Sequence, residues 1–160
     1  MRIHIGSDHA GFDLKQYLLQ HLADQGHEVV DHGAAEYDEA DDYPVYCLRA
    51  AEGVAADPGA LGIVLGGSGN GEQLAANEVP GVRAALVWSA QTAELARAHN
   101  DASVIAIGAR MHTLAEAATL VDIFLRTPFS KDPRHVRRLA MLSDYEEHRR
   151  LPPLPEGRRD

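Results

Sequence analysis

The segment LGIVLGGSGNGEQLAAN, Leu61 to Asn77, joins three different patterns in one short run. Its first six residues are apolar or glycine at every position, as in a strand that is covered on both faces of a sheet. A loop rich in glycine follows, and residues 71–77 have the composition of a helix. A strand that leads through glycines into a helix is typical of βαβ units. The segment therefore predicts an α/β fold with a parallel sheet.

The same alternation of short apolar runs and longer helical stretches extends in both directions. The predicted strands cover residues 2–7, 27–32, 61–66, 82–88 and 103–108, and the predicted helices lie near residues 12–25, 42–56, 71–77, 90–99, 114–125 and 133–149. We expect right-handed crossovers and one domain over residues 1–150. The tail LPPLPEGRRD, residues 151–160, is rich in proline and charge, and we expect it to be an extended arm or disordered.

Composition excludes several classes of protein. The 160 residues carry a formal net charge of −9, which argues against nucleic acid as a partner because a nucleic-acid-binding domain should be basic. No apolar run approaches the roughly 20 residues of a membrane helix, so we expect no membrane partner. Cys47 is the one cysteine, and the first residues show no signal peptide. Both features favour a reducing, cytoplasmic location.

The glycine-rich loop departs from three motifs that it superficially matches. The dinucleotide fingerprint fails because its third glycine is missing in either register, and the serine-hydrolase elbow fails at Asn70. The phosphate loop of nucleotide hydrolases matches at Gly66 and Gly71. It then has Glu72 and Gln73 where that motif requires Lys and Ser or Thr. Nucleotide hydrolysis is therefore not expected.

Glu72 in the first turn of the predicted helix leaves two interpretations open. The free N–H groups of the loop and the helix dipole favour negative charge, so they suit an oxyanion that forms during a reaction. A carboxylate beside that oxyanion would move a proton, provided that a water-poor site raises its pKa. Proton abstraction next to a carbonyl, giving an enediolate, fits these groups. Alternatively, the glycines make a tight turn and Glu72 is an acid at a helix terminus.

Further candidates lie where parallel sheets bind ligands, at the carboxyl ends of strands. Asp8 and His9 follow the first predicted strand. Such a pair alone is more often a turn and cap, but its position at the carboxyl end of a strand favours a functional role. Arg110 follows the fifth strand.

His99 and Asn100 end a predicted helix. The simpler explanation for them is a histidine favoured by the helix dipole and an asparagine that caps the helix in the left-handed conformation.

The segment SKDPRHVRR is the dense basic cluster of the chain. Arg134 and Arg138 are four residues apart and therefore share a helix face, which suits a phosphate group. A solvated basic face is the equally weighted alternative. The nine histidines form no pattern with the spacing of metal ligands, and we expect no metal.

Four separate motifs resemble those of type B ribose-5-phosphate isomerases. They are GSDHAGFDLK at residues 6–15, DDYP at Asp41–Pro44, GGSGNGEQLAAN, and ARAHNDASVIAIGARMH at residues 96–112. The resemblance implies a three-layer αβα, Rossmann-like fold with a five-stranded parallel sheet. It implies interconversion of ribose 5-phosphate and ribulose 5-phosphate through a cis-enediolate, in the non-oxidative pentose phosphate pathway, without metal or cofactor. It also implies a homodimer or a dimer of dimers, with active sites at the subunit interface.

The resemblance assigns a role to each matching residue. Many members have a cysteine as base where this chain has Ser68, whereas the mycobacterial subgroup has the serine and uses the glutamate that corresponds to Glu72. His99 matches the histidine that opens the sugar ring. The implied catalytic residues are Glu72, His99 and Ser68. The implied substrate-binding residues are Asp8, His9, Tyr43, Gly67, Gly69, Asn70, Gly71, Asn100, Arg110, Arg134 and Arg138.

Two alternatives remain open at this point. The same chemistry would act on another sugar phosphate, such as galactose 6-phosphate, allose 6-phosphate or a tetrulose phosphate, because the named residues do not measure the length of the sugar. A sugar-phosphate-binding protein without catalysis is the second alternative, and the serine in place of cysteine favours it.

Overall fold

The computed structural model describes residues 1–155. Five strands form one parallel sheet in the order β2-β1-β3-β5-β4. They are β1 (Arg2–Ser7), β2 (Glu28–Asp31), β3 (Leu61–Gly66), β4 (Ala84–Leu86) and β5 (Val104–Gly108). The five-stranded parallel sheet predicted from the sequence is confirmed, and β3 has the predicted bounds.

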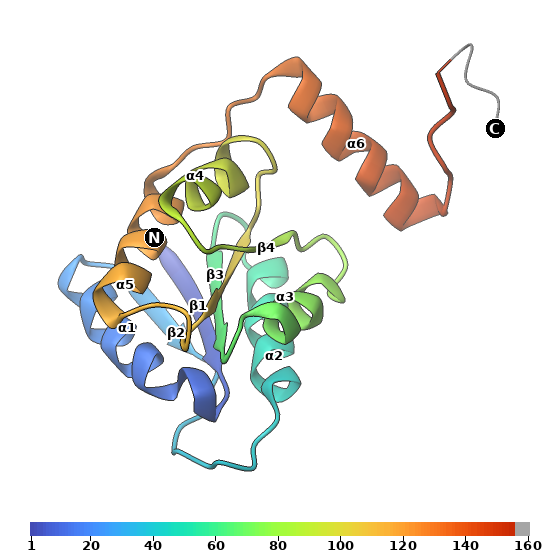
Figure 1. Ribbon diagram of the computed structural model, residues 1–160. Coiled ribbons are helices and arrows are strands. Elements are labelled where there is room, and N and C mark those ends of the chain that lie inside the picture. The colour runs from blue at the N-terminus through green and yellow to red at the C-terminus, as the bar shows by residue number, and fades with distance from the viewer. Residues whose placement is uncertain (156–160) are drawn as a thin grey trace.

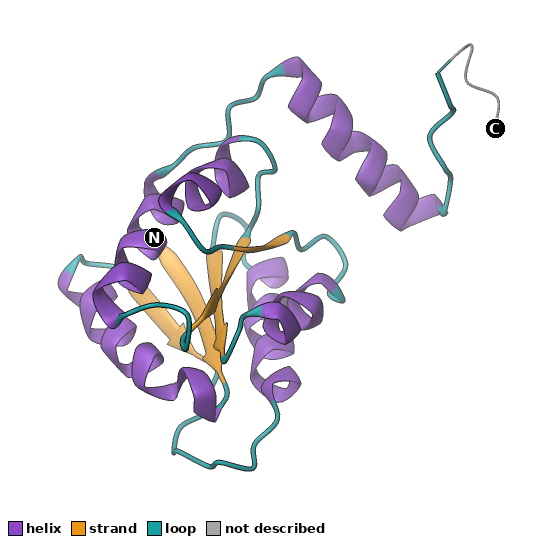
Figure 2. Cartoon of the chain, in the orientation of Figure 1, coloured by secondary structure: helices purple, strands orange, loops and turns teal. Residues whose placement is uncertain are grey.

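Helices cover both faces of the sheet, as Figure 2 shows. They are α1 (Phe12–Asp24), α2 (Tyr43–Ala56), α3 (Asn70–Asn77), α4 (Ala90–Ala98), α5 (Leu114–Arg126) and α6 (Pro133–His148), with a short 3-10 turn, η1 (His9–Gly11). Residues of α1, α4 and α5 pack on one face of the sheet, and residues of α2 and α3 pack on the other. The αβα arrangement is therefore confirmed.

The central strands bury both of their faces. Ile63 and Ile105 point into the core beneath α1, α4 and α5, whereas Val64 and Val104 point into the core beneath α2 and α3. This is the physical basis of the apolar pattern in LGIVLG, because neither face of the strand meets water.

The edge strand β4 is shorter than the predicted strand over residues 82–88. Val82 closes a turn by donating its N–H to the carbonyl of Val79, so pairing with β5 begins at Ala84. At the other end, the N–H of Trp88 bonds the hydroxyl of Thr92 at the start of α4. The two ends of the predicted strand therefore form a turn and a helix cap instead of pairing with β5.

Helix α6 begins as predicted, with Asp132 accepting the N–H of Arg134 and with Pro133 in the first turn. It projects from the body of the protein (Figure 1). Val136, Leu142 and Tyr145 on this helix are exposed. Residues 151–155 have no regular secondary structure, and the rest of the predicted tail, residues 156–160, lies outside the described residues. Within residues 1–155, no helix has the length and apolar character that crossing a membrane requires.

Candidate active site

The carboxyl ends of β1, β3 and β5 lie side by side at one edge of the sheet. The loops after β3 and β5 are bonded to each other: Ala109 N–H donates to the carbonyl of Gly66 at 2.7 Å, and Arg110 N–H donates to that of Gly67 at 3.2 Å. Asp8 follows β1 at the same edge. Three of the predicted site segments therefore meet, as the rule for parallel sheets predicts.

Glu72 is buried at this edge, with 4% of its surface exposed. Its carboxyl group lies against Gly66, where an added Cβ would be 1.8 Å from Oε1. Among the described residues, Oε2 has no hydrogen-bond partner. Burial raises the pKa of Glu72, and the negative charge of Asp8 adds to this, while the N–H groups of Glu72 and Gly69 act in the opposite direction. The water-poor setting that a base in this position needs is present.

The glycines of the loop allow close packing on three sides. Gly69 has φ of +83° and caps α3, a conformation that side-chain-bearing residues rarely adopt. A Cβ on Gly71 would lie 2.7 Å from the ring of Tyr43, so this ring rests on the first turn of α3. Gly67 faces the guanidinium of Arg110, since a Cβ there would lie 3.4 Å from Nη1. Tyr43 and Arg110 thus join the predicted site.

Ser68 is exposed at the tip of the loop. Its hydroxyl accepts hydrogen bonds from the backbone N–H of Asn70 at 3.3 Å and from the side-chain amide of Asn70 at 3.2 Å. These are the bonds of its hydroxyl among the described residues. Within residues 1–155 no base is bonded to this hydroxyl, so its chemistry is that of a hydrogen-bonding group.

Asp8 and His9 follow β1 and have different surroundings. Asp8 Oδ1 accepts the N–H groups of Ala10 at 3.0 Å and Gly11 at 3.3 Å, so the capping interpretation of Asp8 is correct. His9 Nδ1 bonds Asp41 Oδ1 at 2.7 Å. That hydrogen bond raises the pKa of His9 most, and the charge of Asp8 also raises it.

Asp41 is a residue that the sequence analysis missed, although it lies in the quoted motif DDYP. Its Oδ1 accepts hydrogen bonds from the backbone N–H and from the ring Nδ1 of His9, 32 positions away in the chain. The signal available in the sequence was an acid two positions before Tyr43. Asp8, His9 and Asp41 bring possible metal ligands within 4.8 Å of one another, the one such group within residues 1–155. Because the His9 nitrogen is taken by the bond to Asp41, the geometry fits a hydrogen-bonded pair.

His99 and Asn100 lie at the opposite edge of the sheet, the one formed by the amino ends of the strands. They follow α4 and precede β5, so the length of β5 separates them from Arg110. The ring of His99 packs on that of His135 in α6, with ring centroids 4.2 Å apart. Burial lowers the pKa of His135, and the charge of His99 lowers it further. The prediction that Asn100 takes the left-handed cap is wrong, because Asp101 has the positive φ, 44°.

The predicted phosphate ligands on α6 belong to the same opposite edge. Arg134 and Arg138 are both exposed, near His135, which contacts His99. Asn100 lines a cavity of about 440 Å³ between α6 and β4, together with Trp88 and other residues. One chain therefore brings the predicted residues together as two groups, one at each edge of the sheet. The first holds Asp8, His9, Tyr43, Gly67, Ser68, Gly69, Asn70, Gly71, Glu72 and Arg110; the second holds His99, Asn100, Arg134 and Arg138.

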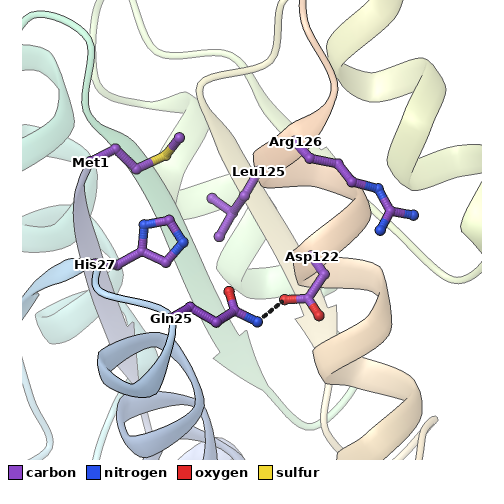
Figure 3. A pocket seen from close by; sticks show the side chains of 6 residues that line it. All are labelled: Met1, Gln25, His27, Asp122, Leu125 and Arg126. Carbon is purple, nitrogen blue, oxygen red and sulfur yellow. Dashed lines mark hydrogen bonds between the residues drawn. The ribbon is translucent and has the colours of Figure 1, made fainter.

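A separate cavity of about 330 Å³ lies at the amino ends of β1 and β2. Figure 3 shows its lining, in which Gln25 donates a hydrogen bond to Asp122 at 3.1 Å. The other lining residues are Met1, His27, Leu125 and Arg126. None of the predicted site residues takes part, so this cavity is distinct from both groups.

Comparison with known proteins identifies the family of the chain. Residues 3–142 match the family described as Ribose/Galactose Isomerase. The chain is 59% identical over 155 residues to ribose-5-phosphate isomerase B of Mycobacterium tuberculosis H37Rv, covering 97% of this chain and 96% of that protein. It is 36% identical over 148 residues to ribose-5-phosphate isomerase B of Escherichia coli K12, covering 92% of this chain and 98% of that protein.

Among solved structures, ribose-5-phosphate isomerase B of Mycoplasma genitalium with bound ribulose-5-phosphate superposes with a TM-score of 0.88. It shares 40% identity and covers 92% of this chain and 97% of that one. Sequence and fold agree over nearly the whole length of the chain. The chain therefore belongs to the ribose/galactose isomerase family.

Proposed function

We propose that this protein is an aldose–ketose isomerase that interconverts D-ribose 5-phosphate and D-ribulose 5-phosphate through a cis-enediolate. The observation that carries the proposal is the buried Glu72 carboxyl, with one unpartnered oxygen and a raised pKa, beside a glycine loop and a helix N-terminus. The name of the 59% identical protein of Mycobacterium tuberculosis, ribose-5-phosphate isomerase B, supports the same substrate.

In this proposal Glu72 takes the proton from C2 of the open-chain sugar and returns it to C1. The proton of the C2 hydroxyl passes to the oxygen on C1, so that the carbonyl moves from C1 to C2. The charge on the enediolate oxygen increases as the proton leaves, and the N–H groups of residues 67–71 stabilise it. Ser68 and Asn100 add hydrogen bonds. A raised pKa makes the Glu72 carboxylate a stronger base than an exposed glutamate, because the proton affinity follows the pKa.

His99 opens the sugar ring, and Arg110, Arg134 and Arg138 bind the phosphate. These residues must therefore meet around one substrate, yet five residues of strand β5, about 13 Å of chain, separate the two groups within one subunit. We propose that a second copy of the chain supplies His99, Asn100, Arg134 and Arg138, in a homodimer or a dimer of dimers with active sites at the interface.

Features of α6 support this assembly. Its apolar residues Val136, Leu142 and Tyr145 are exposed in a single chain, although such residues usually pack in a core. Cavities of about 440 and 680 Å³ lie along this helix, beside β4 and α3. One contact between two copies of the chain would both cover these apolar residues and complete the site.

The test is a panel of phosphorylated sugars with purified protein, run with and without a chelator. We expect ribose 5-phosphate to be turned over fastest and the chelator to have no effect. Faster turnover of a six-carbon or four-carbon sugar phosphate would transfer the assignment to that substrate. Binding of ribose 5-phosphate without isomerisation would favour the non-catalytic alternative.

A further inference from the structure

The side chain of Asp41 holds His9 at two points. Its Oδ1 accepts the backbone N–H of His9 at 2.9 Å and the ring Nδ1–H at 2.7 Å. Only 6% of the Asp41 side chain is exposed, whereas 25% of the His9 side chain is. One buried carboxylate oxygen therefore sets both the position of the His9 backbone and the rotation of its ring.

We infer that Asp41 is a positioning residue, which holds His9 as an imidazolium with Nε2–H directed at the phosphate of the substrate. The inference rests on the proposed function. Because Nδ1 is committed to Asp41, Nε2 is the ring nitrogen left for a ligand, and it has no hydrogen-bond partner among the described residues. An imidazolium donates from both nitrogens at once, so it can bond a carboxylate and an anionic substrate together.

The charges around His9 favour the protonated ring. Asp41 and Asp8 both stabilise the positive charge, and Asp41 is the larger influence. Arg110 at the same edge acts in the opposite direction, as does burial. The ring of Tyr37 stands edge-on to that of His9, with centroids 6.3 Å apart. Arg110 is near enough for its charge to lower the pKa of His9, so the two groups offer positive charge at the same end of the sheet, as a phosphate dianion requires.

Asp41 lies in the loop between β2 and α2, and the start of this loop is anchored to the body of the protein. Lys15, fully buried, donates to both oxygens of Asp31 at 2.8 and 2.6 Å and to the carbonyl of Ala34 at 2.7 Å. The backbone of Ser7 also exchanges hydrogen bonds with Gly33 and Ala34. The start of the loop is therefore bonded to β1 and α1. Near its end, the N–H of Asp41 donates to the carbonyl of Asp38 at 3.1 Å, and the Asp41 carboxylate itself is tied to His9.

Two substitutions separate charge from anchoring. Asp41→Asn keeps an acceptor for both N–H groups of His9 but removes the negative charge. Asp41→Ala removes both. With Asp41→Asn, we expect the pKa of His9 to fall toward the ordinary value of about 6.5. At a pH above the pKa, each unit by which the pKa of His9 falls lowers the fraction of protonated His9 about tenfold.

The direct measurement is a pH titration of the histidine ring nitrogens by ¹⁵N NMR, with the His9 signal assigned by its loss in His9→Gln. We expect the His9 signal to titrate at lower pH in Asp41→Asn than in the wild type. The second measurement is KM for ribose 5-phosphate. We expect KM to rise roughly tenfold at pH 8, for a decrease of one pKa unit, and to rise less at pH 6, with kcat changed less than threefold.

Asp122 gives a matched control, because it forms another His–Asp pair, bonding His21 at 2.8 Å far from the site. Asp122→Asn should leave KM at the wild-type value at both pH values. If Asp41→Asn left the His9 titration and the pH dependence of KM unchanged, the inference would be wrong. An equal loss of kcat at all pH values, accompanied by a lower Tm, would also overturn it, since that result marks a structural role.

Failure of the proposed function would be recognised separately. A wild-type protein that does not isomerise ribose 5-phosphate would overturn the proposed function, whatever Asp41 does. In that case the His9 titration and the binding of inorganic phosphate, followed by the His9 signal, still test whether Asp41 holds the imidazolium for an anion. Normal isomerisation with unchanged His9 behaviour in Asp41→Asn would overturn the inference alone.

Discussion

The carboxyl group of Glu72 fills the space where any side chain on Gly66 would stand. A Cβ at Gly66 would lie 1.8 Å from Oε1 and 2.2 Å from the carboxyl carbon, both far inside contact distance. Gly66 ends β3 without a positive φ, so its backbone does not require glycine. The requirement comes instead from Glu72, and the two residues form one unit of the site.

Gly66→Ala should therefore remove activity by displacing the proposed base, Glu72. The new methyl group must push the Glu72 carboxyl out of its buried position, and we expect kcat to fall by at least ~10²-fold, the scale of general base catalysis. Steady-state kinetics on ribose 5-phosphate measures the loss, and circular dichroism checks that the protein is folded.

Glu72→Gln and the double substitution Gly66→Ala/Glu72→Gln provide the comparison. Because both single changes affect the same group, the double variant should be little worse than Glu72→Gln alone. Losses that multiply would contradict the link between the two residues. Near-wild-type turnover in Glu72→Gln would remove Glu72 from the role of base.

The raised pKa of Glu72 has a consequence for stability. A carboxyl group that binds its proton more tightly when folded stabilises the fold while it is protonated, and this contribution is lost as the pH rises through the folded-state pKa. Glu72→Gln removes the ionisation. We expect its Tm to exceed that of the wild type at pH 8, and the difference to shrink at pH 5. Calorimetric scans at the two pH values measure this, and a lower Tm for Glu72→Gln at pH 8 would contradict it.

The sequence predicted the sheet and the carboxyl-edge group because both follow from local patterns. Successive side chains of LGIVLG point into the cores on opposite faces of the sheet. The residues after the parallel strands β1, β3 and β5 must meet at the carboxyl edge. Asp41 was not predicted because the loop between β2 and α2 brings it to His9, which lies 32 positions earlier in the chain. The periodicity of the sequence gives no sign of such a contact. Lys15 was missed for the opposite reason: a lysine in a helix usually reaches water, and nothing local marks this one as fully buried.

Lys15→Met should destabilise the protein. The lysine neutralises Asp31 and bonds the Ala34 carbonyl. Methionine would remove the Nζ donor from both and leave Asp31 with the N–H of Gly33 alone. Asp31 is partly exposed, which moderates the cost, so we expect the free energy of unfolding to fall by about 2–4 kcal/mol. Urea denaturation measures the change. Lys131→Met, at an exposed position, is the control and should stay within about 0.5 kcal/mol of the wild type. Equal effects at the two positions would show that the Lys15 contacts contribute nothing specific.

The separation of Glu72 and His99 at opposite edges of the sheet predicts complementation between two inactive variants. If each active site combines Glu72 of one subunit with His99 of another, Glu72→Gln and His99→Gln are each inactive alone. A mixed dimer carries one site with both changes and one site with neither. Co-refolding equal amounts should therefore restore about one quarter of wild-type activity, since about half of the dimers are mixed and each has one intact site.

The control is the pair Glu72→Gln and Gly66→Ala, whose changes fall in the same group at the carboxyl edge. Every site of that mixed dimer keeps one damaged loop, so mixing should restore nothing. Activity recovered by both pairs would point to contamination or reversion. No recovery by the first pair, with mixed dimers demonstrated by differently tagged subunits, would mean that Glu72 and His99 do not share a site across the interface. The second copy would then have to cover α6 for a reason other than catalysis.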